Sequence, residues 1–134
     1  MAIDPKTGTG IVNDYYIGPG VDLRGAKLAS ADLRGADLRG ANLKSAFFSR
    51  AGFHGADLAG ADLRGTDLYY TNFEGANLEG ANLRVANLRY TNLSHANLFL
   101  ANFADVTLIS SANFNGAYMD DKLLQFIISR GAIL

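Results

Sequence analysis

The sequence predicts an all-β solenoid in which every five residues form one short side of a coil. Three observations lead to this prediction. From Val21 to Ser110 the chain reads as eighteen consecutive five-residue units. The centre of every unit is Leu or Phe, and a small or β-branched residue stands two positions earlier. Asp or Asn stands between those two in fourteen of the eighteen units and Gly closes eight of them, which supplies the residues that turns favour.

A period of five excludes the two regular alternatives. Five residues turn an α-helix by about 500°, so the large apolar side chains would be spread around its whole circumference. In a straight strand, successive units would point these side chains to opposite faces. If each unit instead ends at a corner, the central residue and the small residue before it both point inward. The other three residues of the unit then point outward.

The tandem pattern A-(D/N)-L-x-x, seen in Val21-Asp22-Leu23-Arg24-Gly25, resembles that of the pentapeptide-repeat family. The resemblance extends over all of Val21–Ser110. It implies a right-handed quadrilateral β-helix with four units in each coil, and about five coils for this chain. Residues twenty apart are then expected to stack at strand spacing, about 4.8 Å. The resemblance also suggests a bacterial source, and in particular a cyanobacterial one, because the family is abundant there.

Residues 1–20 are expected to form an N-terminal tail and partial cap. They are rich in Gly and Pro, and residues 1–9 are expected to be mobile. An apolar group that follows is expected to cover the first coil, because an open solenoid edge exposes unpaired backbone groups. Its members are Ile11, Val12, Tyr15, Tyr16 and Ile17.

The repeat is expected to continue to residue 121, with one extra residue near 110–111. Leu108 and Phe114 are six residues apart instead of five, which predicts a bulge at the Ser110-Ser111 corner. Residues 122–134 are expected to form a short capping α-helix and tail, because Asp120 or Asp121 can cap its start and Gly131 can end it. The alternative is a helix that binds a partner. Either a monomer or a homodimer joined through one end of the solenoid fits this organisation.

The composition argues against several kinds of chemistry. The chain has 134 residues, a formal net charge of −1 and no Cys, so disulfides and thiolate metal sites are excluded and nucleic-acid binding is disfavoured. His54 and His95 are expected two coils apart, too far to share a metal ion. The Ser and carboxylate residues recur as parts of the repeat, and the sequence has no P-loop or dinucleotide motif. We therefore expect no catalysis, no cofactor and no metal site.

The location predicted from the sequence is the cytoplasm. No apolar stretch approaches the roughly 18 residues that a membrane-spanning helix needs, and the N-terminal residues lack an apolar signal region. A lumenal or periplasmic location would fit only if the chain is a processed form.

Two departures from the repeat are candidate interaction surfaces. The first is an outward column of four basic residues spaced twenty apart: Arg24, Lys44, Arg64 and Arg84. Their charges are either neutralised by Asp22 and Asp62, or they form a docking stripe for an anionic partner. An aromatic group lies on the face whose closing positions lack Gly, and a further pair lies on another face. Exposed aromatic residues often mark protein interfaces. The first group is Phe47, Tyr69, Tyr70 and Tyr90, and the pair is Phe99 and Leu100.

The sequence thus favours a structural or protein-interaction scaffold with an unknown protein partner. The resemblance implies an alternative, a modulator of DNA gyrase that mimics duplex DNA. Such a mimic needs a dense negative surface to compete for a basic groove. Val21–Ser110 contains nine basic and nine acidic residues, which disfavours this alternative.

Overall fold

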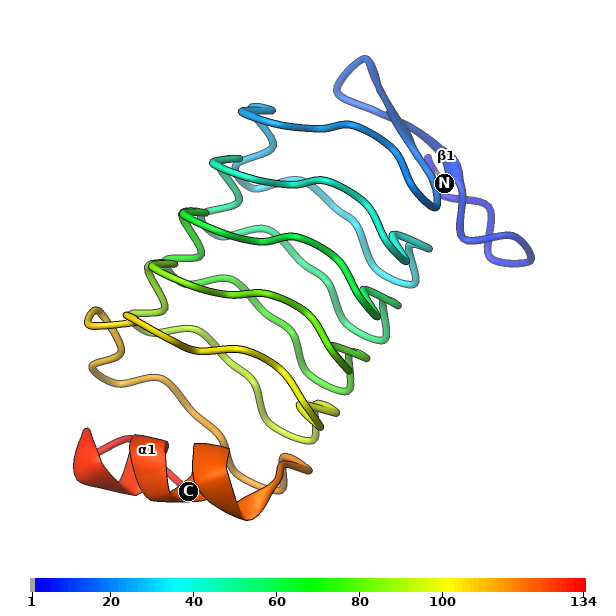
Figure 1. Cartoon of the computed structure of the whole chain (residues 1–134). Helices are drawn as coiled ribbons and strands as arrows, with labels where there is room; N and C mark the ends of the chain where they lie inside the picture. The colour runs from blue at the N-terminus through cyan, green and yellow to red at the C-terminus, as the bar shows by residue number, and fades with distance from the viewer. Residues whose placement is uncertain (1) are drawn as a thin grey trace.

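A computed structural model describes residues 2–134. The chain winds into a stack of similar coils, with a small hairpin at the N-terminal end and a helix at the C-terminal end (Figure 1). Parallel bridges join residues twenty apart, such as Asp22 to Asn42 and Asn42 to Asp62. These bridges confirm the predicted fold class, a quadrilateral β-helix built from five-residue units.

Backbone hydrogen bonds join each unit to the coils above and below it. In a typical unit, Leu43 N donates to Asp62 O at 2.8 Å, and Asp62 N donates in return to Ala41 O at 2.9 Å. Ser45 N donates to Arg64 O at 2.9 Å. The first amide of each unit instead donates within its own coil, as Ala46 N does to Leu43 O at 3.0 Å. Because the other ladder groups pair with neighbouring coils, the stack forms a continuous ladder that leaves unpaired edges at its two ends.

The bridges define four sides of the solenoid, numbered here in chain order. Each side consists of the outward residues that pair from coil to coil, together with the two corner residues that follow each of them. The first side is Asp22, Asn42, Asp62, Asn82 and Asn102; the second is Lys27, Phe47, Asp67 and Asn87; the third is Asp32, Gly52, Asn72, Asn92 and Asn113; the fourth is Asp37, Asp57, Asn77, Asn97 and Tyr118.

The core consists of the two inward positions of each unit. Every central Leu or Phe from Leu23 to Phe103 is buried, and each contributes about 1.5–3 kcal/mol by its removal from water. Phe53 and Phe73 stack with ring centres 4.8 Å apart and planes 10° apart, as the twenty-residue coil predicts. Where Thr replaces the small residue, its hydroxyl is paired: Thr71 Oγ1 donates to Phe48 O at 2.7 Å.

The corners are built from side-chain and backbone turn chemistry. The Asp or Asn before the central residue accepts a hydrogen bond from the backbone two positions on, as when Arg24 N donates to Asp22 Oδ1 at 3.2 Å. The closing residue of each corner has a left-handed backbone, with φ of 67° at Gly25 and 57° at Tyr70. This conformation costs a residue other than Gly about 1–2 kcal/mol, which explains the preference for Gly there.

The extra residue lies on the second side, so its predicted place at the Ser110-Ser111 corner is wrong. Ile109 is 3% exposed and fills the core position, whereas Leu108 is 44% exposed. Leu88 N donates to Leu108 O at 2.7 Å, twenty residues on instead of the usual nineteen. Ser111, with φ of 59°, closes the corner. Two residues, Thr107 and Leu108, therefore take the place of one, which is a bulge that puts Ile109 five residues before Phe114 and restores the register.

The N-terminal segment forms a β-hairpin cap, with β1 at Gly10–Val12 and β2 at Tyr15–Ile17. Val12 and Ile17 are buried as expected, but Ile11 and Tyr16 are exposed because alternate residues of a strand point to opposite faces. The segment before β1 is packed instead of mobile. Ile3 is buried and pairs with Gly10, and Gly8 O accepts a hydrogen bond from Asp37 N at 2.7 Å. The hairpin and residues 2–9 thus cap the first coil; residue 1 lies outside the described residues.

The C-terminal helix α1 spans Asp121–Ser129 and crosses the end of the last coil (Figure 1). Asp120 caps it by accepting a hydrogen bond from Leu123 N at 2.9 Å, and Gly131 follows its end with φ of 69°. Leu123 and Ile127 are buried in the core cluster. Ile133 then pairs with Asn113, so the chain returns to the solenoid after the helix.

Candidate interaction surface

Most of the predicted basic column is neutralised by neighbouring carboxylates. Arg24 forms a two-pronged ion pair with Asp22, with Nε 2.9 Å from Oδ1 and Nη2 2.8 Å from Oδ2. Arg64 pairs with Asp62 at 2.7 Å in the same way. The hydrogen bonds from these arginines hold the pKa of Asp22 and of Asp62 below the usual value.

The other two members of the column differ from each other. Arg84 pairs with Asp105 at 2.8 Å. The charge of Lys44 also lowers the pKa of Asp62, but by less than Arg64 does. Within residues 2–134, Lys44 makes no ion pair shorter than 4.0 Å. Lys44 is therefore the one cation of the column whose charge lacks a direct partner in the described chain.

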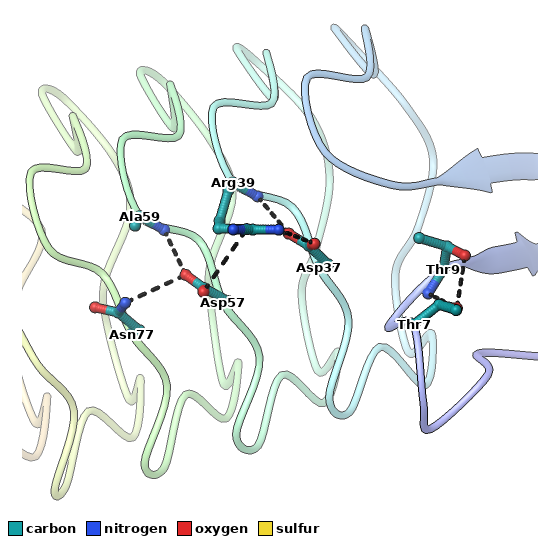
Figure 2. A network of polar contacts seen from close by, with 7 residues as sticks. All are labelled: Thr7, Thr9, Asp37, Arg39, Asp57, Ala59 and Asn77. Atoms are coloured by element: carbon teal, nitrogen blue, oxygen red, sulfur yellow. Dashed lines mark hydrogen bonds and ion pairs between the residues drawn. The ribbon is translucent and has the colours of Figure 1, made fainter.

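The fourth side shows how the outward column tolerates stacked carboxylates (Figure 2). Arg39 lies between Asp37 and Asp57, with nitrogen–oxygen distances of 2.7 and 3.9 Å. Asp57 Oδ1 then accepts a hydrogen bond from Asn77 Nδ2 at 3.2 Å. Two carboxylates stacked in adjacent coils repel each other unless a cation lies between them, whereas an Asn side chain can donate a hydrogen bond to the side chain in the adjacent coil. This pattern explains why Asn replaces Asp in the later coils, and it is structural.

Every Arg that stands two residues after an Asp in the repeat is paired with that Asp. The four pairs are Asp22–Arg24, Asp32–Arg34, Asp37–Arg39 and Asp62–Arg64. With Arg84 also paired, four basic residues of the repeat have no ion pair within the described part of the chain: Lys27, Lys44, Arg50 and Arg89. All four lie on the second side or on the corner that precedes it.

The same side carries a compact cluster of aromatic and cationic side chains. The rings of Tyr70 and Tyr90 stack with centres 4.7 Å apart and planes 3° apart. Tyr69 meets both of them edge-on, at 4.8 and 5.7 Å. Arg50 lies over Tyr70 with its guanidinium carbon 5.0 Å from the ring centre, and the Arg89 guanidinium lies 5.8 Å from the centre of Tyr69. We call these five residues the Tyr–Arg cluster.

The backbone under the cluster is strained. Arg50, Tyr70 and Tyr90 occupy closing positions with φ of 61°, 57° and 60°. Gly stands at nine of the other closing positions, and seven more, such as Ser30 and Val85, have another residue in the same conformation. Each costs about 1–2 kcal/mol in this conformation. An aromatic pair stabilises the fold by about 0.5–1.5 kcal/mol, and an exposed cation–π contact stabilises it by about 0.5–1 kcal/mol. The cluster therefore offsets its own strain at best, and it adds no clear net stability.

The six aromatic and apolar residues predicted from the sequence fall into two separate regions. Phe47 is exposed on the second side, where its backbone forms parallel β-bridges with Lys27 and Asp67 in the adjacent coils. It therefore borders the same surface as the Tyr–Arg cluster. Phe99 and Leu100 are corner residues of the fourth side. Phe99 packs on Tyr118, with ring centres 5.6 Å apart.

Leu100 belongs to an apolar cavity at the C-terminal end of the solenoid. Leu100 is exposed and lines a cavity of about 470 Å³ together with Phe103, Leu123 and Phe126. The cavity lies between the last coil and helix α1. Helix α1 therefore covers the end of the solenoid incompletely on this side.

The charges of the repeat are distributed unevenly around the solenoid. Over residues 21–111, the first and second sides with their corners have seven basic and four acidic residues, a net of +3. The third and fourth sides, up to Leu100, have two basic and five acidic residues, a net of −3. The near-zero total of the repeat conceals this difference between its two halves.

Lys27, Arg50 and Arg89 were not among the site residues predicted from the sequence. The sequence carried part of the signal for Arg89: Asp-Leu-Arg marks an arginine paired with its own unit, whereas in Asn-Leu-Arg the side chain before the arginine is neutral. This signal does not separate Arg89 from Arg84, which also follows Asn-Leu but pairs with Asp105. Arg89 Nε donates to Asn87 Oδ1 at 3.2 Å, which leaves its charge uncompensated.

The two histidines lie at separate places on the third side. The Nε2 of His54 lies 2.7 Å from Asn72 Nδ2. Within residues 2–134 no group of three or more His, Cys, Asp or Glu side chains is placed to hold a metal ion. None of the helices found in this range is long and apolar enough to cross a membrane.

Comparisons with known proteins agree with the geometry of the repeat. A family model described as pentapeptide repeats matches residues 20–53, 48–84 and 69–105, with eight copies. The crystal structure of alr5209, a pentapeptide repeat protein from Nostoc PCC 7120, is 32% identical, with a TM-score of 0.57 and 84% of each chain covered. No curated protein sequence matches the chain.

Two further solved structures are similar to parts of the chain. QnrB1, described as a plasmid-mediated fluoroquinolone resistance protein, is 15% identical with a TM-score of 0.52, covering 84% of this chain and 67% of its own. Rfr23, a pentapeptide repeat protein from the cyanobacterium Cyanothece 51142, is 28% identical with a TM-score of 0.35, covering 77% and 86%. The Nostoc relative agrees with the cyanobacterial source that the resemblance suggests. The family model, which matches more than half of the chain, and the 32% identical Nostoc protein show that the chain belongs to the pentapeptide-repeat family.

Proposed function

We propose that this protein is a non-catalytic scaffold that binds another protein through the second side of its solenoid. The Tyr–Arg cluster is the observation that supports this function. Tyr70 and Tyr90 are 44% and 45% exposed, and Arg50 and Arg89 flank them. Tyr and Arg are the residue types that most often dominate the binding energy of protein interfaces.

The strain under the cluster supports a role in binding over a role in stability. Gly at a closing position would relieve the left-handed backbone, yet Arg50, Tyr70 and Tyr90 stand there together. A fixed ladder of rings also reduces the conformational entropy that a partner would otherwise have to overcome on binding.

Gyrase modulation by DNA mimicry is the alternative, and charge argues against it. Seven of the nine basic residues of the repeat lie on the first and second sides, which makes that half of the surface positive. A duplex mimic would present carboxylates on that half as well. A supercoiling assay with purified protein and DNA gyrase is expected to show neither inhibition nor protection. Either effect would establish the alternative.

An affinity capture with matched variants tests the proposed scaffold function. The immobilised protein is incubated with an extract of its source cells, and the retained proteins are quantified by mass spectrometry. We expect a defined protein to be retained by the unaltered chain and lost with Tyr70→Ser/Tyr90→Ser. Tyr118→Ser is the control, because Tyr118 is also an exposed tyrosine, at 62%, but lies on the fourth side. Equal retention by all three baits would contradict the proposal.

The cytoplasmic location and the state of association, monomer or end-joined homodimer, stay predictions from the sequence. Cell fractionation tests the first. Sedimentation velocity of the full chain tests the second.

A further inference from the structure

We propose that the partner of the second side is an acidic protein segment whose carboxylates pair with the cations around the tyrosines. This inference rests on the proposed function and names the chemistry of its partner. Four uncompensated cations carry it: Lys27, Lys44, Arg50 and Arg89.

The placement of these cations does not follow from the repeat itself. Nine basic residues occur in Val21–Ser110, and the five with an ion pair are spread over the first, third and fourth sides. The four without an ion pair, judged over residues 2–134, all lie on the second side or on the corner before it. Two of the four, Arg50 and Arg89, lie beside the tyrosine rings of the exposed cluster. This placement marks one surface of the solenoid as electrostatically incomplete.

One carboxylate lies on the same surface and has to be counted. Asp67 bridges Phe47 and Asn87 on the second side, and its Oδ1 accepts a hydrogen bond from Tyr69 N at 3.2 Å. Against the four unpaired cations it leaves the surface at +3. A partner that supplies carboxylates would therefore still gain by pairing, chiefly at Arg50 and Arg89 beside the rings.

The surface fits an acidic protein segment better than a nucleic acid. A nucleic-acid strand needs a continuous line of cations along its phosphates. Here Asp67 lies within the surface, and the neighbouring arginines of the first side, Arg24 and Arg64, already hold carboxylates. An acidic segment with an apolar or aromatic residue can instead place carboxylates on the four cations and its apolar side chain against Phe47 and the tyrosine rings.

Defined probes distinguish these partners. The first is a fluorescent peptide of about twelve residues that alternates Glu with Ser around a central Phe, and the second replaces each Glu by Gln; the third is a single-stranded oligothymidylate of similar length. Binding is followed by fluorescence anisotropy at about 50 mM and about 300 mM salt. We expect the Glu peptide to bind at least about tenfold tighter than the other two probes, and salt to weaken it.

Charge variants locate the binding. Arg50→Gln/Arg89→Gln is expected to weaken Glu-peptide binding by about fivefold or more, since it removes two uncompensated charges. Arg34→Gln/Arg39→Gln removes the same formal charge from paired positions on the third and fourth sides, and is expected to change binding by less than about twofold.

Several outcomes would overturn the acidic assignment. These are an equal loss in both charge variants, equal binding of the Glu and Gln peptides, tighter binding of the oligothymidylate, or no binding of any probe. If a captured partner depends on Tyr70 and Tyr90 but its binding is insensitive to salt and to Arg50→Gln/Arg89→Gln, the acidic assignment fails and the proposed scaffold function stands. Loss of the tyrosine dependence would instead remove the scaffold function.

Discussion

The plain five-residue pattern predicts that Leu108 is in the core, whereas the bulge on the second side places Ile109 there instead. Ile109 is 3% exposed and occupies the core column, whereas Leu108 is 44% exposed. Ile109→Ala is expected to cost about 3 kcal/mol, because replacing a buried Ile or Leu by Ala costs about 2–5 kcal/mol through lost burial and the cavity left behind. For a chain of this size that corresponds to a fall in Tm of roughly 10 °C.

Leu108→Ala is the matched control for this prediction. It removes a similar apolar volume one residue away, from a side chain that is almost half exposed to solvent in the folded protein. The expected loss in the free energy of unfolding is under about 1 kcal/mol. Both variants are compared with the unaltered chain by circular dichroism during thermal and guanidinium unfolding. A larger loss for Leu108→Ala than for Ile109→Ala would refute the bulge and restore Leu108 to the core.

Three further predictions concern the cap, the ion pairs and the buried hydroxyls. Gly8→Ala is expected to destabilise the protein by about 1–3 kcal/mol more than Gly25→Ala in the same unfolding assay, since both have positive φ but only at Gly8 would the added methyl meet backbone, 2.8 Å from Asp37 N. The hydrogen bonds from Arg34 lower the pKa of Asp32 from 3.8 to about 2, so its ionised form favours folding above about pH 4 and this contribution is lost as the pH falls toward 2. A Tm series over that range is expected to fall less steeply in Arg34→Gln; an identical slope would contradict this assignment. Thr71→Val keeps the shape but loses the hydrogen bond to Phe48 O, and a cost of about 1 kcal/mol in unfolding is expected, with no change as the contrary result.

The coil and its core could be predicted because the repeat leaves few alternatives. A residue such as Leu43 recurs every five positions, and only a turn at each unit buries all of its counterparts together. The Asp or Asn beside it was correctly assigned to the corner, since its side chain binds the backbone two positions on. The start and end of helix α1 followed from Asp120 and Gly131, whose capping chemistry is local.

The bulge could not be placed from the sequence because Leu108 and Ile109 are equally suited to the core. Only the ladder to the coil above, with Leu88 bonded to Leu108 O, decides which one points inward. The ordered N-terminal segment was missed for a related reason. Its contacts, such as Gly8 O with Asp37 N, join residues far apart in the chain that share no pattern.

The candidate surface was predicted in part. Tyr69, Tyr70 and Tyr90 were singled out because they interrupt the Gly positions, and they form one cluster. For the basic column, the sequence left two alternatives open, neutralisation by Asp22 and Asp62 or docking of a partner. Whether an ion pair forms depends on side-chain geometry as well as on position. Of the predicted column, Arg24, Arg64 and Arg84 form ion pairs, and its use as a docking stripe stays a prediction.

Mapping of the Glu peptide by NMR tests the central claim most directly. Backbone amide shifts of the full, isotope-labelled chain are followed as the peptide is added. The second side is predicted to respond, with the largest changes at Tyr69, Tyr70, Arg89 and Tyr90, while the third side around Asn72 and Asn92 stays unchanged. Changes centred on the third or fourth side, or spread evenly over all four, would contradict the claim that the Tyr–Arg cluster is the recognition surface.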